Sequence, residues 1–193
     1  KALPQTLQAL FAQPGEFETI LVDGGSTDRT IEIARSFANV NLITAQKGRA
    51  SQMNAGAKQA QGEWLLFLHA DTRLPHGAIQ RLNDMEDSRD IQAGGFMHQF
   101  SGDDWRLKLI SFLDNVRCLR SRIVYGDQAL FVRRELFHRL GGFPDVPILE
   151  DVAFCEKLLT LTNPLILNAP AVTDARKFIK MGIGRSFIRV LLI

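Results

Sequence analysis

The fold is decided by the stretch Trp64-Leu65-Leu66-Phe67-Leu68-His69-Ala70-Asp71-Thr72. Its five leading apolar residues predict a strand that is buried on both faces, as in a parallel sheet covered by helices. The apolar run stops at His69 and Asp71, and ligands of such sheets bind just beyond the carboxyl ends of the strands. An aspartate at this place could hold a divalent cation or a polar substrate, or it could only cap the turn that follows.

A second predicted strand, residues 17–22, ends in the same way. Asp23 follows it directly, and the glycine pair Gly24-Gly25 then leads into a predicted helix over residues 28–38. Glycine permits positive φ and close backbone approach, and a helix N-terminus favours anions. Asp23 and its turn therefore suit an anionic or nucleotide ligand.

Length and composition describe an ordinary globular domain. The chain has 193 residues, of which 46% are hydrophobic and 23% charged, so we expect one domain over residues 1–193. The net charge of +2 gives no reason to expect nucleic-acid binding. The two cysteines have no metal-like spacing, and no stretch resembles a membrane span or a signal peptide. These features predict a cytoplasmic protein.

The order of elements predicts an α/β fold with a mostly parallel, Rossmann-like sheet flanked by helices. Helices are expected at residues 1–12, 28–38 and 49–60, and strands at 17–22, 40–43 and 64–69. Because such a sheet seldom begins on a helix, we expect a first strand to precede Lys1 and to be missing from this sequence.

The second half is predicted to contain strands at residues 93–100 and 129–132, and a helix that opens at Glu150-Asp151. A long helix from about residue 103 is expected to turn an apolar face inward, formed by Trp105, Leu109, Phe112, Leu113 and Val116. His98 shares a strand face with two phenylalanines, which is more typical of a core histidine than of a catalytic one.

The tail over residues 171–193 is basic and partly apolar. It predicts a C-terminal helix, which either docks on the body with a solvated basic face or meets anionic lipid at the inner face of the membrane.

Taken in order, several motifs resemble a family 2 glycosyltransferase of the GT-A fold. They occupy residues 21–28, 47–56, 62–72, 125–128, 141–144 and 150–151. Each motif is weak alone, but the ordered set is specific. The His69-Ala70-Asp71 and Tyr125-Gly126-Asp127-Gln128 segments are similar to the bacterial radical-SAM/selenodomain-associated transferase subgroup.

The resemblance implies a nucleotide-sugar donor, with UDP- or GDP-sugars expected, bound by residues 1–72. Donor-binding positions would be Asp23, Gly24, Arg49, His69, Asp71 and Arg176. Asp71 matches the last aspartate of the family's Asp-x-Asp motif, which holds Mn²⁺ or Mg²⁺ on the diphosphate. His69 stands where the family usually has the first aspartate, so one carboxylate is lost.

The resemblance also implies an inverting, metal-assisted transfer, with an unknown acceptor on the side of residues 91–170. Asp151 matches the catalytic base, and Glu150 is the neighbouring alternative; without the resemblance, both could simply stabilise a helix N-terminus. Asp127 and Gln128 would line the acceptor side. Two other functions stay open, a non-catalytic nucleotide-sugar-binding module and a sugar nucleotidyltransferase.

Overall fold

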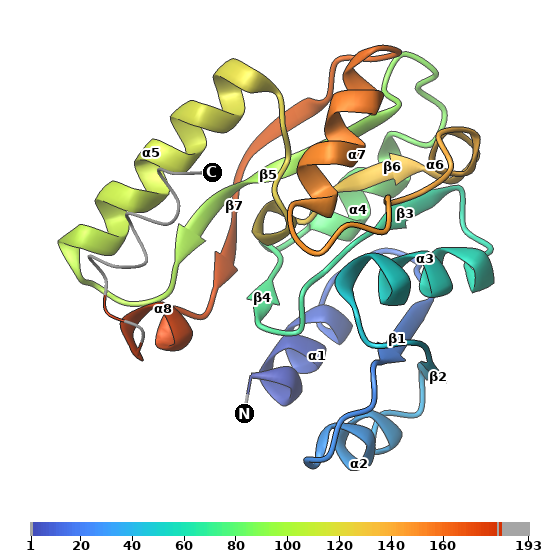
Figure 1. Cartoon of the computed structure of the whole chain (residues 1–193), viewed down its shortest axis with the longest axis vertical. Coiled ribbons are helices and arrows are strands. Elements are labelled where there is room, and N and C mark those ends of the chain that lie inside the picture. Colours follow the sequence, from blue (N-terminus) through green and yellow to red (C-terminus); the bar gives the residue numbers. More distant parts are fainter. Residues whose placement is uncertain (1, 181, 183–193) are drawn as a thin grey trace.

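The computed structural model describes residues 2–180 and 182. Its first part follows the predicted alternation of helices and strands (Figure 1): α1 (Leu3–Phe11), β1 (Thr19–Asp23), α2 (Thr30–Arg35), β2 (Val40–Thr44) and α3 (Arg49–Gln59). β1 and β2 pair in parallel, from Thr19 opposite Val40 to Asp23 opposite Thr44. They form a two-stranded sheet of their own. The prediction of a further strand before Lys1 stays untested.

The larger sheet is mixed, so the prediction of a mostly parallel sheet was wrong. Its order is β3-β6-β5-β7-β4, formed by β3 (Trp64–Leu66), β6 (Phe131–Arg133), β5 (Ala93–Phe100), β7 (Leu165–Thr173) and β4 (Thr72–Arg73). Only the β5–β7 pair is parallel among these, and the other three pairs are antiparallel. Apolar patterning reports burial but not strand direction, which explains the error.

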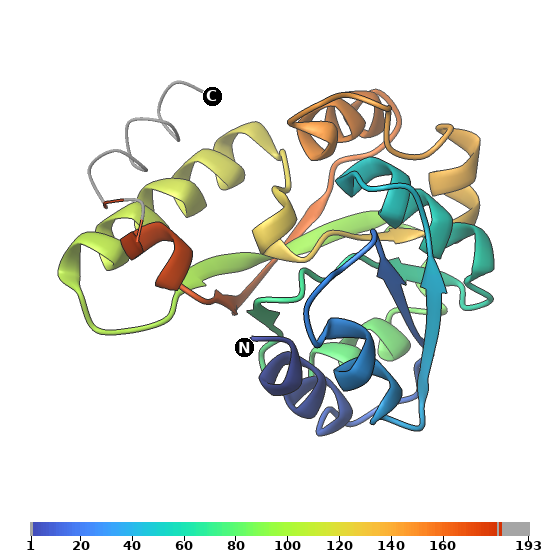
Figure 2. The same ribbon diagram turned by 60° about the horizontal axis from the view of Figure 1, so that its bottom comes forward.

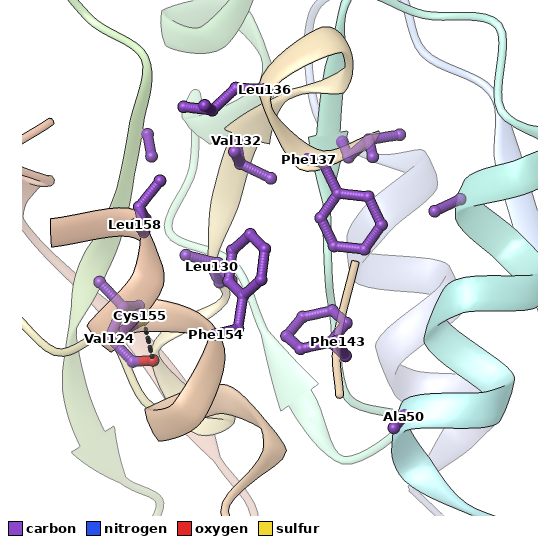
Figure 3. Packing of buried hydrophobic residues seen from close by; sticks show 13 residues of the cluster. Ala50, Val124, Leu130, Val132, Leu136, Phe137, Phe143, Phe154, Cys155 and Leu158 are labelled. Carbon is purple, nitrogen blue, oxygen red and sulfur yellow. Dashed lines mark hydrogen bonds between the residues drawn. The ribbon is translucent and has the colours of Figure 1, made fainter. Parts of the chain in front are cut away.

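Helices cover both faces of the mixed sheet. Val132 of β6 belongs to a core under α3, α6 (Arg134–Arg139) and α7 (Glu150–Leu159), where Phe137, Phe143 and Phe154 face one another (Figure 3). Its neighbour Phe131 points to the opposite face and packs with α4 (Ala78–Asp84). This alternation is the two-residue period of a strand, and it places the carboxyl end of β3 between two packed layers.

α5 (Trp105–Ser121) turns the opposite face to the sheet from the one predicted. Leu107, Ile110 and Cys118 are buried, whereas Trp105 is 70% and Phe112 61% exposed. Polar anchors explain the choice of face: Ser111 and Asn115 of α5 bond to the backbone of β5, which the apolar stripe could not do. In Figure 2, α5 lies along the outer end of β5 and β7.

The predicted basic tail begins later than residue 171. β7 continues to Thr173 inside the mixed sheet, and helical structure begins with α8 (Arg176–Lys180). Most of the rest of the tail lies outside the described residues. Within residues 2–180 and 182, no helix combines the length and the apolar character needed to cross a bilayer.

Candidate active site

Asp71 lies in a loop that is fixed at both ends. Phe67 N–H donates to the carbonyl of Leu130 at 2.8 Å, one residue beyond β3, and the chain then turns back into β4. The Asp71 carbonyl accepts from Asp174 N–H at 2.9 Å, at the end of β7. The side chains of Asp71, Arg73 and Asp174 line a small cavity of about 30 Å³. The loop backbone therefore holds Asp71 just before β4 and beside the end of β7, whereas β3 ends at Leu66, three residues before the predicted end at residue 69.

The turn Tyr125–Gln128 lies against this loop. Gly126 has no room for a side chain, because a Cβ there would lie 2.5 Å from Cε1 of His69. The N–H of Gly126 donates to Oδ2 of Asp151 at 2.7 Å. A single glycine thus touches the His69 loop on one side and the start of α7 on the other.

Gln128 is buried within the turn. Its Oε1 accepts from Tyr125 N–H at 3.0 Å, and only 1% of the residue is exposed. Gln128 was predicted on the acceptor side together with Asp127; in the structure it holds the shape of the turn, whereas the Asp127 side chain remains 34% exposed. The next residue, Ala129, has φ 48°.

Glu150 and Asp151 are both buried at the first turn of α7. Leu149, just before them, has φ 63°, a conformation that is unfavourable for a bulky residue and is found where surrounding structure imposes it. Oε1 of Glu150 lies 3.8 Å from Nη1 of Arg49 at the start of α3, and the Arg49 side chain is otherwise 68% exposed. α3 and α7 therefore present a cation and two carboxylates at the same place.

His69 lies against Gly126 and within electrostatic reach of these groups. Burial lowers its pKa and Arg49 lowers it further, while the carboxylates of Asp127, Asp71 and Asp151 act in the opposite direction. Because the net shift is downward, the imidazole is neutral at neutral pH, with one N–H donor and one acceptor nitrogen. The structure thus brings together six predicted residues: Arg49, His69, Asp71, Asp127, Glu150 and Asp151.

Asp23 organises a turn of its own at the end of β1. Its carboxylate accepts from the N–H groups of Gly25 at 2.8 Å and Ser26 at 3.0 Å. Hydrogen bonds from Ser26 and Gly25 lower the pKa of Asp23, so it is ionised at neutral pH. Gly24 faces α3, where a Cβ would meet the Gln52 amide at 2.8 Å.

Arg176 begins α8 and pairs with Asp174. Nε donates to the two carboxylate oxygens at 2.9 and 2.7 Å. Asp174 raises the pKa of Arg176, and Asp71 adds a smaller effect in the same direction. Arg176 therefore lies within electrostatic reach of Asp71, and its expected role in donor binding stays a prediction.

Two residues of the 47–56 motif have roles that the sequence did not reveal. Asn54 makes two hydrogen bonds with the backbone of Phe143. Nδ2 of Asn54 donates to the Phe143 carbonyl at 2.8 Å, and the Phe143 N–H donates to Oδ1 of Asn54 at 2.9 Å. A Cβ on Gly142 would lie 2.6 Å from the same Oδ1. Gln52 donates to the Val22 carbonyl at 2.9 Å. The only sequence signal for these contacts was that residues 47–56 and residues 141–144 are both among the motifs that resemble family 2.

The side chains that could act as metal ligands fit an ion shared with the substrate phosphates. They do not fit an ion that protein side chains enclose alone. Among the residues that the structure describes, no cluster of three or more His, Cys, Asp or Glu side chains could hold a metal. Mg²⁺ and related ions are commonly held by one or two carboxylates together with substrate phosphates. Asp71, in its loop beside an open cavity, satisfies that requirement.

The model of glycosyl transferase family 2 matches residues 1–143. The chain belongs to this family. A PGL/p-HBAD biosynthesis glycosyltransferase of Mycobacterium tuberculosis (strain ATCC 25177 / H37Ra) is 34% identical over 152 residues, which cover 73% of this chain and 57% of the relative. An undecaprenyl-phosphate 4-deoxy-4-formamido-L-arabinose transferase of Edwardsiella ictaluri is 30% identical over 58% of this chain and 37% of its own length. The family 2 chain thus spans little more than half of the former.

Solved structures show the same fold. The mannosyltransferase PcManGT from Pyrobaculum calidifontis, in complex with GDP-Man and Mn²⁺, aligns with a TM-score of 0.68 at 22% identity over 89% of this chain and 53% of its own. Staphylococcus aureus TarS 1–349 in complex with UDP-GlcNAc gives 0.69 at 21% identity over 89% and 54%. Both likenesses establish a GT-A-like α/β fold for this family 2 chain.

Proposed function

We propose that this chain transfers a sugar from a nucleotide-diphosphate donor to an acceptor hydroxyl, with inversion and with help from a divalent cation. The observation that carries the proposal is that Gly126 lies against both His69 and Asp151, beside the Arg49–Glu150 pair at the start of the same helix. A shared cluster of this kind is expected of an active site and not of surface charge.

Donor binding is proposed for residues 1–72 together with Arg176. Asp23 and Gly24 would receive the nucleotide base, while Arg49 and His69 would meet the ribose and the diphosphate. GDP-Man and UDP-GlcNAc are bound by the two solved relatives, which supports a GDP- or UDP-sugar here. The His69 motif and the Tyr125–Gln128 turn also support membership of the radical-SAM/selenodomain-associated subgroup.

Asp71 would hold the cation on the diphosphate. When bound, Mn²⁺ or Mg²⁺ would offset the negative charge that the leaving diphosphate gains. Arg49, with its mostly exposed guanidinium, can contribute a second positive charge to the same oxygens. Arg176 is committed to Asp174 in the structure and would have to exchange that partner for phosphate.

Residues 91–170 would position the acceptor and remove its proton. The acceptor oxygen bonds to the anomeric carbon as the bond from that carbon to the phosphate oxygen breaks, and the hydroxyl proton passes to Asp151. The Gly126 N–H fixes the orientation of the Asp151 carboxylate for this role. Glu150 is held by Arg49 instead, which makes it the weaker candidate for the base.

The test measures nucleotide release from UDP-GlcNAc and GDP-Man, with and without Mn²⁺. We expect metal-dependent turnover of one donor, and a loss of roughly 100-fold in Asp71→Asn, which keeps the shape but removes the charge. The matched control is Asp90→Asn, an exposed acid before β5. Donor binding by calorimetry without any turnover would instead favour a non-catalytic binding module.

A further inference from the structure

His98 lies in the middle of β5 and its side chain has no exposed surface. Its backbone is anchored to α5, because His98 N–H donates to Oδ1 of Asn115 at 2.7 Å and Nδ2 of Asn115 donates back to the His98 carbonyl at 2.9 Å. The ring also packs edge-on against Phe100, with centroids 4.5 Å apart. The imidazole therefore has a fixed position and orientation.

Each ring nitrogen of His98 faces a carboxylate. Nδ1 lies 3.4 Å from Oδ2 of Asp114 on α5, and Nε2 lies 3.4 Å from Oδ2 of Asp127 in the turn beside the active site. Neither contact has hydrogen-bond geometry, so both nitrogens are buried without a hydrogen-bond partner among the described residues and face the carboxylates as potential ion pairs. Only the protonated imidazolium carries an N–H on both nitrogens, so only that form can serve both carboxylates.

We propose that His98 is a positioning residue of the sugar-transfer site, which in its imidazolium form holds the Asp127 carboxylate in place beside the acceptor. The proposal rests on the proposed function, because Asp127 has an acceptor to meet only if transfer occurs. It assigns a role to a side chain that touches neither substrate and that the sequence pattern indicated to be an ordinary core residue.

The charges around the ring favour this form. Burial would lower the pKa of His98, but Asp127 and then Asp114 raise it, and their effect prevails over burial and over Arg117. Arg117 itself bonds to Asp114 at 3.2 Å and lies over the Tyr125 ring at 4.0 Å. From β7, the strand paired with β5, the residue opposite His98 is Ala171, which is uncharged.

His98 is connected to the proposed base, Asp151, through the adjacent residues Asp127 and Gly126. Asp127 is bonded covalently to Gly126, whose N–H holds Asp151 and whose Cα faces His69. Loss of the positive charge at His98 would leave the Asp127 carboxylate beside a neutral ring, without the electrostatic attraction that holds it in place. A role in stability alone would not require the transfer rate to depend on the charge of His98.

The first test follows the His98 ring by NMR across a pH titration and needs no substrate. We expect its pKa to exceed the ordinary value of about 6.5, and to fall in Asp127→Asn, a change at a partly exposed residue that leaves the core intact. His76, which is exposed, is the internal reference. A His98 titration that does not respond to Asp127→Asn overturns the proposal, whether or not the protein transfers sugar.

The second test compares nucleotide release from UDP-GlcNAc and GDP-Man against pH in the wild type and His98→Gln. Glutamine can still donate to Asp127 but cannot carry a charge. We expect wild-type kcat to decline as pH rises through the His98 pKa. In His98→Gln this decline should be absent, and kcat at low pH should be roughly tenfold lower than in the wild type. His76→Gln should match the wild type. An unchanged profile in His98→Gln overturns the proposal, and absence of turnover in every protein argues instead against the proposed function.

Discussion

The two turns beside the candidate site are held in different ways. The Asp23–Ser26 turn is local: one carboxylate accepts from the N–H groups two and three residues later. The Tyr125–Gln128 turn depends on distant elements, with Asp151 of α7, His98 of β5 and His69 all against it. The first turn can be read from its own residues, whereas the contacts of the second turn with His69, His98 and Asp151 form only in the folded chain. We therefore expect changes at the second turn to lower kcat, and changes at the first turn to act on donor binding and on local stability.

The largest effect is expected at the contact between the second turn and α7. Asp151→Asn keeps an oxygen for the Gly126 N–H but removes the base, so kcat for transfer should fall by about 10²–10⁴-fold. Steady-state kinetics on the confirmed donor measure this, and Asp90→Asn serves as the control. A variant with wild-type kcat would remove Asp151 from the mechanism.

Next in size is the effect of adding a methyl group to each turn. Gly126→Ala would drive a Cβ into the His69 ring, so we expect a loss of stability of about 1–3 kcal/mol together with reduced transfer. Gly25→Ala meets nothing within 4 Å, although its φ of 91° is unfavourable for alanine and makes it less stable by roughly 1 kcal/mol. Denaturant unfolding and kinetics of both variants test the comparison.

Gly62→Ala is the control for the methyl series, because that position has only ordinary contacts and no positive φ. If Gly25→Ala impaired transfer as strongly as Gly126→Ala at equal stability, the contrast between a local and a long-range turn would fail.

The smallest effect is expected from pH at the first turn. The folded pKa of Asp23 is lowered, so its contribution to stability is present above its ordinary value of 3.8 and is lost as pH falls through the folded value. Asp23→Asn should lower the thermal midpoint at neutral pH by about 2–4 °C, with the difference shrinking in acid. Thermal unfolding of both proteins between neutral and acidic pH measures this; a constant difference would show that the charge is irrelevant.

Sequence patterns predicted the elements well where one face of an element is buried. β1, α2, β2, α3, β5 and α7 appear where expected, and the positions of Asp23, Asp71 and Asp151 at the ends of elements followed from them. Strand direction was not predictable, since β3 pairs with β6, which lies far along the chain. α5 was misoriented because it carries two apolar stripes, and the choice between them depends on polar partners in β5.

The rest of the site could not be read from local sequence. His98 is separated from Asp114 and Asp127 along the chain, and their contact exists only once α5 lies on β5. β7 was missed because Asn168 and Pro170 interrupt its pattern; the register against β5 shifts between Phe96 and Met97, next to the proline that cannot donate a ladder hydrogen bond.

The two hydrogen bonds between Asn54 and Phe143 limit which substitutions this sequence can accept during evolution. Oδ1 of Asn54 takes the N–H of Phe143 and also fills the space beside Gly142. A descendant that acquired a side chain at 142 would therefore have to move or shorten the Asn54 side chain, and would also place that new side chain on a backbone with a φ of 71°. Positions 54 and 142 should therefore covary, so an alignment of natural variants should show them changing together or not at all.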